Sequence, residues 1–326
     1  MKDDLRATCA RAAPVDVEAP MTSYAQTRLS WARRVSSYGE LPDVYHDCLK
    51  ASLGDRPLPH AVLTPTYLGF IHRENEKLVF SLDQHLHVCE RTNGGLTCTC
   101  YALEDIHLVE SGSILLYAWL RIHGVASHGG AVMSILRFNS VTAHLFAPFA
   151  DEIRGASGDL AGVDHEPEIQ KLDRLSQPSF KFRNYARRSL LPDEQVIDAL
   201  WQPEIRHDLL TLLGRSFYRT IATTHLLVLT DRELIVLRED EESQRWRDES
   251  RYGGVWIYIP LDKIASITLT KTDTNLLALS VHLPQNDCIE SLFVAAQQPA
   301  VDRFLSRIAS MTIKPLPARP QSRRPV

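Results

Sequence analysis

The sequence predicts a mostly β protein with some α-helix, built from two tandem units that are each a bent antiparallel sheet capped by a C-terminal helix. Three observations support this: the second half repeats the first, short apolar strands follow one another, and each half ends in a helical pattern. The repeated blocks keep their order and nearly constant offsets, which chance rarely preserves. They pair Arg33-Arg34 and Leu41-Pro42-Asp43 with Arg187-Arg188 and Leu191-Pro192-Asp193, Leu82 to Val88 with Thr230 to Val236, and Tyr101 to Ile106 with Ile259 to Ile264.

Length and composition fit two soluble domains. The chain has 326 residues, of which 44% are hydrophobic and 23% charged, so each half has enough apolar material to bury a core. No apolar run is long enough to span a bilayer, the first residues lack a signal-peptide pattern, and the six cysteines do not form a secreted disulfide framework. We therefore expect a cytoplasmic protein with reduced thiols. The formal net charge of -4 argues against nucleic-acid binding.

Composition divides the chain into five segments. Proline and alanine near the start indicate a flexible leader over residues 1–27, and glycine and proline between the halves indicate a linker over 156–180. The first unit then spans 28–155 and the second spans 181–310. A basic, proline-rich tail, expected to be disordered, covers 311–326.

The second unit has strand after strand and then a helix. Short apolar runs alternate with turn residues, and Asp231-Arg232 joins two of the runs as a hairpin. A helix is predicted over Pro299 to Met311, because proline suits a first turn and apolar residues follow at helical spacing. The predicted strands are Thr223 to Leu229, Glu233 to Leu237, Val255 to Leu261, Ile264 to Thr270, Leu276 to Leu283 and Ile289 to Ala295.

The first unit ends in a similar helical pattern. Val141, Leu145, Phe149 and Ile153 lie at helical spacing, so a helix with these residues on one face is expected. Pro148 lies inside this pattern and implies a kink or a late start of the helix.

The turn and strand residues of the second unit follow a recognisable order. A run from Leu226 to Val236, centred on Leu229-Thr230-Asp231-Arg232, precedes Ile259-Pro260-Leu261-Asp262-Lys263-Ile264. This order resembles the small bacterial PH-like domains of the pleckstrin-homology superfold, and the internal repeat extends the resemblance to the first unit. The resemblance implies about seven short strands capped by one helix, and a role in docking and scaffolding, sometimes at membranes. It is a likeness of fold and carries no catalytic chemistry.

Phosphoinositide-binding PH domains hold headgroup phosphates with Lys and Arg side chains clustered between the first two strands. The basic residues in the matching stretches of this chain are spread out, so classical phosphoinositide recognition is not expected. They are Arg56, His72, Arg73 and Lys77 in the first unit and Arg206, Arg215 and Arg219 in the second.

One predicted hairpin of the first unit carries four imidazole and thiol groups. If Asn93-Gly94 makes the turn, Cys89 faces Cys98 and His87 faces Cys100, and all four side chains lie on one face of the sheet. Such groups can bind zinc. Ligands on flat strands need a third element to close a tetrahedron, however, and the equivalent residues of the second unit are apolar. We therefore expect packing, with Cys89, Cys98 and Cys100 reduced and free of metal.

The second unit has a sheet with two apolar faces. Leu234, Val236, Ile257 and Ile259 can face the core of the unit, and a second apolar set lies on the opposite face. A half-solvated sheet would alternate apolar with polar residues, so something must cover the second set. The first unit, the helical segment between the units, or a second copy of the chain could do so, and an intramolecular cover is favoured. The predicted interface residues are Ile235, Leu237, Trp256 and Tyr258.

Four charged segments complete the candidates. The acidic run Glu239 to Glu242, with the nearby Arg245, Arg247 and Arg251, is expected to be a solvated loop, with partner binding as the alternative. The pairs Arg33-Arg34 and Arg187-Arg188 are each expected on a short helical segment before a first strand. The basic residues of the tail could add weak contact with an anionic membrane; they are Lys314, Arg319, Arg323 and Arg324.

No motif in the sequence indicates catalysis. The chain has thirteen histidines and a Ser127-His128-Gly129-Gly130 loop, but neither a Gly-x-Ser-x-Gly elbow nor a Walker-type loop. We therefore predict no catalytic residue, no cofactor and no enzymatic activity. The predicted function is an interaction or scaffold module that docks a protein partner. The alternatives are a peripheral membrane adaptor that binds anionic lipid, and a metal-binding or enzymatic protein that uses the face of His87, Cys89, Cys98 and Cys100.

Overall fold

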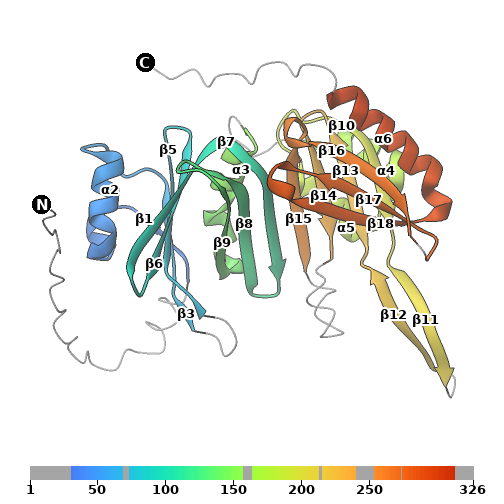
Figure 1. The fold of residues 1–326 in the computed structure, drawn as a ribbon, viewed down its shortest axis with the longest axis horizontal. Coiled ribbons are helices and arrows are strands. Elements are labelled where there is room, and N and C mark those ends of the chain that lie inside the picture. The colour runs from blue at the N-terminus through green and yellow to red at the C-terminus, as the bar shows by residue number, and fades with distance from the viewer. Residues whose placement is uncertain are drawn as a thin grey trace, which may run out of the picture.

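The fold is known from a computed structural model that describes residues 31–68, 73–156, 164–212, 215–239, 253–272 and 274–312. The protein is mostly β, with one large antiparallel sheet and a helix at the C-terminal end (Figure 1). The predicted leader over 1–27, the tail residues 313–326 and the loop residues 240–252 lie outside the described residues, so the expectations for those segments concern parts of the chain that are not described.

The described residues of the first half form nine strands. The chain runs from β1 through two short 3-10 segments into α2, then through a strand meander, and closes with a 3-10 segment and α3. The elements are β1 (Arg33–Val35), η1 (Tyr38–Glu40), η2 (Asp43–Tyr45), α2 (His46–Leu53), β2 (Ala61–Thr64), β3 (Tyr67–Leu68), β4 (Arg73–Glu74), β5 (Lys77–Leu82), β6 (His85–Thr92), β7 (Gly95–Ile114), β8 (Tyr117–Ala126), β9 (Ala131–Asn139), η3 (Ser140–Leu145) and α3 (Ala147–Ile153).

The second half has a related order of elements, but it starts with two helices and its last strands form a separate sheet. Two helices precede a strand, a hairpin, three further strands of the large sheet, a separate three-stranded sheet and the last helix. The elements are α4 (Glu166–Ser176), α5 (Phe180–Ser189), β10 (Val196–Gln202), β11 (Ile205–Leu212), β12 (Arg215–Ala222), β13 (His225–Thr230), β14 (Glu233–Arg238), β15 (Gly254–Pro260), η6 (Leu261–Lys263), β16 (Ser266–Lys271), β17 (Leu276–His282), η7 (Pro284–Asn286), β18 (Cys288–Val294), η8 (Ala295–Gln297) and α6 (Gln298–Thr312).

The large sheet continues from one half into the other. Its eleven strands follow the order β1-β2-β5-β6-β7-β15-β14-β13-β10, with β8 and β9 branching from β7. The two halves meet where β15 pairs with the last part of β7, from Val109 opposite Tyr258 to Ser113 opposite Gly254. The two predicted units therefore share a sheet and do not form two separate ones.

The two hairpins predicted from turn residues are confirmed, but the predicted meander of the second unit is interrupted, because β15 pairs with β7 and β16 pairs with β17 in a separate sheet. The β13–β14 hairpin turns at Asp231-Arg232, and all six predicted strands of the second unit are present within a few residues of their expected bounds. The β6–β7 hairpin turns at Asn93-Gly94, because Thr92 pairs with Gly95. Gly95 has a φ of 125°, which residues with a side chain rarely adopt.

Some local expectations were wrong. Arg33-Arg34 lies in the short strand β1 and not on a helical segment, whereas Arg187-Arg188 lies near the end of α5. Of the two outcomes expected for Pro148, a late start is the correct one, because it lies in the first turn of α3 and the preceding residues form a 3-10 helix. Val141 belongs to that 3-10 helix and is exposed, so it does not share the buried face of α3.

Helices cover both faces of the sheet in both halves. In the second half, Val236 and Ile257 pack under α6 in one hydrophobic cluster, whereas Leu237 belongs to another cluster that contains Phe182 of α5. In the first half, Val88 packs in the cluster of α3, and Phe80 on the other face packs under α2. Each half thus has its last helix on one face and an earlier helix on the opposite face.

Helix α4 lies inside the predicted linker over 156–180. Its residues Ile169 and Leu172 are fully buried in the cluster that also contains α3 and α5. This part of the predicted linker is therefore a packed helix that contributes to the core between the halves.

Candidate functional site

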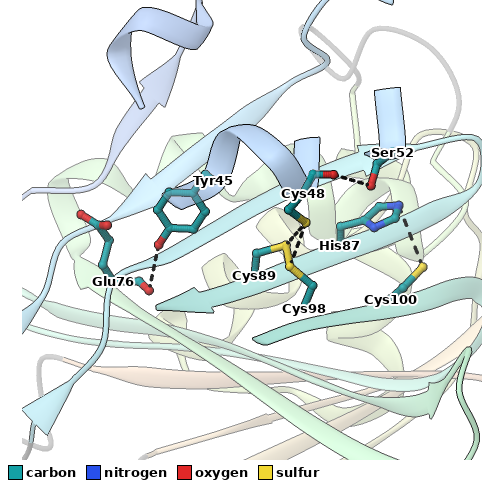
Figure 2. The surroundings of a disulfide bond; sticks show 8 residues. All are labelled: Tyr45, Cys48, Ser52, Glu76, His87, Cys89, Cys98 and Cys100. Atoms are coloured by element: carbon teal, nitrogen blue, oxygen red, sulfur yellow. Dashed lines mark hydrogen bonds between the residues drawn. A yellow bond between two sulfur atoms is a disulfide. The ribbon is translucent and has the colours of Figure 1, made fainter. Parts of the chain in front are cut away.

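Three cysteine sulfurs converge where α2 crosses the β6–β7 hairpin (Figure 2). Cys89 and Cys98 face each other across the two strands, with Cα atoms 4.0 Å apart, as the sequence predicted. Cys48 points down from α2, and its Sγ lies 3.0 Å from Cys98 Sγ and 3.5 Å from Cys89 Sγ. The third sulfur was missed because Cys48 lies 41 residues before Cys89 and no local pattern links the two.

The expectation of reduced thiols is wrong for two of these cysteines. Cys89 and Cys98 form a disulfide, whereas Cys48 and Cys100 are free. The physical reason is the register. Directly opposed residues on neighbouring antiparallel strands have their β-carbons close enough for the two sulfur atoms to bond. Burial raises the pKa of the Cys48 thiol, so this group is protonated at neutral pH in the absence of a metal ion.

The predicted set of four does not form one group. His87 faces Cys100 across the strands as expected, with its Nε2 3.9 Å from Cys100 Sγ, but this pair stands beside the three sulfurs (Figure 2). The His87 ring stacks on Phe80, with centroids 4.5 Å apart. Burial, followed by the neighbouring His85, lowers the pKa of His87, so its ring is neutral at pH 7.

The four predicted interface residues lie on one face of the β14–β15 hairpin. Ile235 faces Tyr258 and Leu237 faces Trp256, the same arrangement that the first hairpin gives His87, Cys100, Cys89 and Cys98. Ile235 and Leu237 are fully buried, Tyr258 is buried and Trp256 is half-buried.

Helix α5 of the same chain lies on this face. The Tyr185 ring packs 4.7 Å from the Trp256 ring, centroid to centroid, and the Tyr185 hydroxyl donates to the carbonyl of Gly253. Phe182 is buried in the same cluster as Leu237. Burial raises the pKa of Tyr185, so its hydroxyl keeps its proton and its donor role.

A cleft of about 630 Å³ opens beside this face, between the two halves. Strands β7 and β8 form one side, α3 and η3 a second, and β15 with α5 a third. Its walls are largely apolar, and Asp151, Arg154, Arg188 and His144 place polar groups in it. Arg188 is exposed, and among the described residues no carboxylate pairs with it. Such a concave apolar site with a few polar groups is typical of ligand-binding clefts.

An exposed apolar tip lies next to the cleft. Leu115 and Leu116 form the turn between β7 and β8, Tyr117 is the first residue of β8, and Leu116 is 65% exposed. Ser113 and Ala118, which flank this tip, both line the cleft. Three consecutive exposed apolar side chains are unusual on the surface of a soluble protein.

A buried ionic cluster holds the floor of the cleft together. Arg154, at the end of α3, donates to the Glu233 carboxylate at 3.0 Å through Nε and lies 3.8 Å above the Tyr258 ring. Glu194 lies close to the same guanidinium, 3.9 Å away. Burial and the charge of Glu233 raise the pKa of Glu194 to about 7. This cluster joins the first half to the second and has no sequence signal, because its members are distant in the chain.

A second polar junction joins the halves close to the point where β7 begins to pair with β15. Asp287 accepts from His107 Nε2 at 2.7 Å and from His123 Nδ1 at 3.1 Å. Burial opposes the charge of Asp287, but the two hydrogen bonds outweigh it and hold the pKa of this carboxyl below its usual value. The group has hydrogen-bond partners within the protein, so it is explained as an interdomain contact.

The basic residues considered for headgroup binding are dispersed, and the carboxylates of the chain neutralise some of them. Arg56 pairs with Asp83, Lys77 lies 3.6 Å from Glu90, and Arg206 pairs with Glu204. His72 lies outside the described residues, as do the side chains of Arg73 and Arg215. Arg219 is exposed on β12.

The described helices include none that combines the length and the apolar character needed to cross a membrane. Comparison of the chain with protein-family models and with curated proteins finds no match.

Proposed function

We propose that this chain is a non-enzymatic docking protein built from two PH-like units, which binds a protein partner at the cleft between them. The observation that carries the proposal is the cleft itself, with the exposed tip of Leu115, Leu116 and Tyr117 at its side. Apolar walls and an apolar rim favour a partner that buries hydrophobic side chains.

The order of elements in the second half supports the PH-like assignment. Strands β10, β13, β14 and β15 pair in sequence, β16, β17 and β18 form the next three, and α6 closes the unit. In both halves a hairpin, β3–β4 or β11–β12, interrupts the connection between the first two of these strands. This likeness is one of topology, whereas the docking function rests on the cleft.

The charges of the cleft indicate the chemistry of the partner. Arg188 offers an exposed guanidinium beside the apolar walls. We therefore propose a protein segment that places an apolar side chain next to a carboxylate, because a carboxylate pairs favourably with arginine. The cytoplasm is the proposed compartment, following the sequence expectation.

Site-specific photocrosslinking tests this proposal. A photoreactive residue in place of Leu116 should yield a protein adduct of one defined mass in the native cells, and a Arg188→Glu variant should lose it. The same probe in place of Ser306, exposed on α6, is the matched control and should give no such adduct. A Leu116 adduct that persists in the Arg188→Glu variant, or the same adduct from Ser306, would contradict the proposal.

A peripheral membrane adaptor is the second candidate, since the same exposed tip could insert into a lipid surface. Co-sedimentation with vesicles containing anionic lipid separates the two. If the parent binds the vesicles and the Leu116→Asp variant does not, the membrane is favoured. If neither the parent nor the variant sediments with the vesicles, a protein partner is favoured.

A further inference from the structure

The three sulfurs of Cys48, Cys89 and Cys98 are held by a firmly packed framework. Helix α2 and the 3-10 turn before it bury Tyr45, Leu49 and Leu53 almost completely against the sheet. The Tyr45 hydroxyl also donates to the carbonyl of Glu76, which pins the start of the helix above the strands (Figure 2). The position of Cys48 above the hairpin is therefore set by the core and not by a surface loop.

The sulfurs form a triangle that suits one metal ion. Their Sγ atoms all lie within 4.8 Å of one another, and they come from two elements, the helix and the hairpin. The helix supplies the third ligand that a flat pair of strands lacks. Thiolate sulfur is a soft ligand that selects zinc and copper(I), and three protein ligands leave a fourth position for water in a tetrahedral site. Cys98 is exposed, so that position can face solvent.

We propose that Cys48, Cys89 and Cys98 form a redox-gated site that binds one thiophilic metal ion of the zinc class when the Cys89–Cys98 disulfide is reduced. With the disulfide closed, only Cys48 can offer a thiolate, and the site has no affinity for the ion. A thiol or phosphine reductant opens the disulfide to two thiols. The ion then displaces one proton from each of the three thiols, and its positive charge stabilises the thiolates in a partly buried place where a free thiolate is unfavourable.

The neighbouring groups do not belong to this site. His87 is directed at Cys100 and stacks on Phe80, so neither it nor Cys100 completes the triangle. Cys288 is exposed at the start of β18 in the second half. Cys100 and Cys288 therefore provide matched control positions.

The test uses the whole chain and Co²⁺ as a spectroscopic probe for zinc. The protein is reduced with a water-soluble phosphine, which becomes a phosphine oxide as it takes up oxygen from water, and excess reagent is removed without air. One equivalent of Co²⁺ should produce thiolate-to-cobalt charge-transfer absorption, which Zn²⁺ should abolish. Protein with the disulfide intact should show no such band.

Variants decide which sulfurs bind. Cys48→Ser and Cys98→Ser should each weaken Co²⁺ binding at least about tenfold, and should lower the charge-transfer intensity per bound ion by about a third. Cys100→Ser and Cys288→Ser should bind as the parent does. Cys98 is exposed, so its variant stays informative even if Cys48→Ser disturbs α2. No band in the reduced parent, or a parental band in both Cys48→Ser and Cys98→Ser, would overturn the proposal.

The His107, His123 and Asp287 group is a second place where an ion could bind, and it is distinguished by its chemistry. It holds no sulfur, so Co²⁺ there gives no thiolate band. An Asp287→Asn variant should keep the full band.

Discussion

The β6–β7 hairpin of the first half and the β14–β15 hairpin of the second place four side chains at matching registers. In the first they are His87, Cys89, Cys98 and Cys100, and in the second Ile235, Leu237, Trp256 and Tyr258. A helix lies on each set, α2 with a thiol and α5 with an aromatic ring. The duplicated position has thus been given sulfur chemistry in one half and hydrophobic packing in the other, on the same backbone pattern.

The difference shows how little the backbone constrains the role of such a face. Both faces are covered, since residues on both are buried. In the second half the cover also forms one side of the cleft between the halves. In the first half the cover is α2, which lies at one end of the molecule (Figure 1), away from α3, β8 and β15, whose residues line the cleft. Its chemistry is therefore free to serve a separate purpose.

The strongest way to break the link between the halves is to remove the arginine that joins them. Arg154→Met should lower the free energy of unfolding by about 3–5 kcal/mol, because the Glu233 carboxylate is left buried and unpaired. Urea unfolding at pH 7 measures the change. Arg307→Met, on the exposed face of α6, is the control and should stay within about 0.5 kcal/mol. Equal stability of both variants would mean that the cluster does not hold the halves together.

Matched substitutions compare the two hairpins directly. Trp256→Asp should cost about 2–4 kcal/mol, because it loses ring packing against Tyr185 and brings a charge next to the core. Cys98→Asp, at the equivalent register but exposed, should cost less than about 1 kcal/mol relative to parent protein whose disulfide has been reduced. Unfolding is measured with reductant present. Limited proteolysis should release fragments faster from the Trp256 variant, and parental behaviour of that variant would show that α5 does not hold this face.

The pH dependence distinguishes the halves at the start of each repeat, where the second has Glu194 and the first has Val44. Burial raises the pKa of Glu194 from 4.5 to about 7, so its contribution to stability is lost as the pH rises between these values. Burial lowers the pKa of His225 from 6.5 to about 4, so its contribution is lost as the pH falls through this window. In the parent, these two groups therefore change the free energy of unfolding with pH in opposite directions.

Glu194→Gln removes the pH dependence of stability that is due to Glu194 and leaves the one that is due to His225. Relative to the parent, the variant should gain stability between pH 5 and pH 8, by up to about 2–3 kcal/mol. Urea unfolding at four pH values measures this difference. A difference that does not change with pH would show that Glu194 titrates normally in the folded protein.

The smallest effect on stability is expected at the exposed tip. Leu116→Asp should change the free energy of unfolding by less than about 0.5 kcal/mol, because the side chain is 65% exposed. The same change should abolish capture of the partner through a photoreactive residue at Tyr117. A stable variant that still captures the partner through Tyr117 would show that Leu116 does not contribute to docking.

Local sequence signals predicted the parts of the fold that depend on neighbouring residues. Asp231-Arg232 and Asn93-Gly94 gave the correct hairpins and therefore the correct facing pairs, since side chains alternate along a strand. The internal repeat alone was enough to predict that Cys89 and Leu237 hold equivalent positions in the two halves. The apolar second face of β14 and β15 also correctly indicated that something covers it.

Contacts between distant segments could not be predicted. The pairing of β7 with β15 joins residues about 145 positions apart, and nothing in either strand identifies its partner. Cys48 reaches the other sulfurs only because α2 packs through Tyr45, Leu49 and Leu53. Arg33-Arg34 was misplaced because the repeat was extended to the secondary structure around it, and tertiary pairing with β2 decided otherwise.

The 20-residue strand β7 has a consequence for folding while the protein is being synthesised. Its last residues pair with β15, which begins about 140 residues further along the chain. At a synthesis rate of about 5–20 residues per second, roughly 7–30 s pass between the two. During that time the nascent first half leaves the ribosome with an unpaired strand edge, which other chains could join. Ribosomes spaced closely on one message would then carry neighbouring nascent chains with the same open edge, so slower initiation should favour correct assembly.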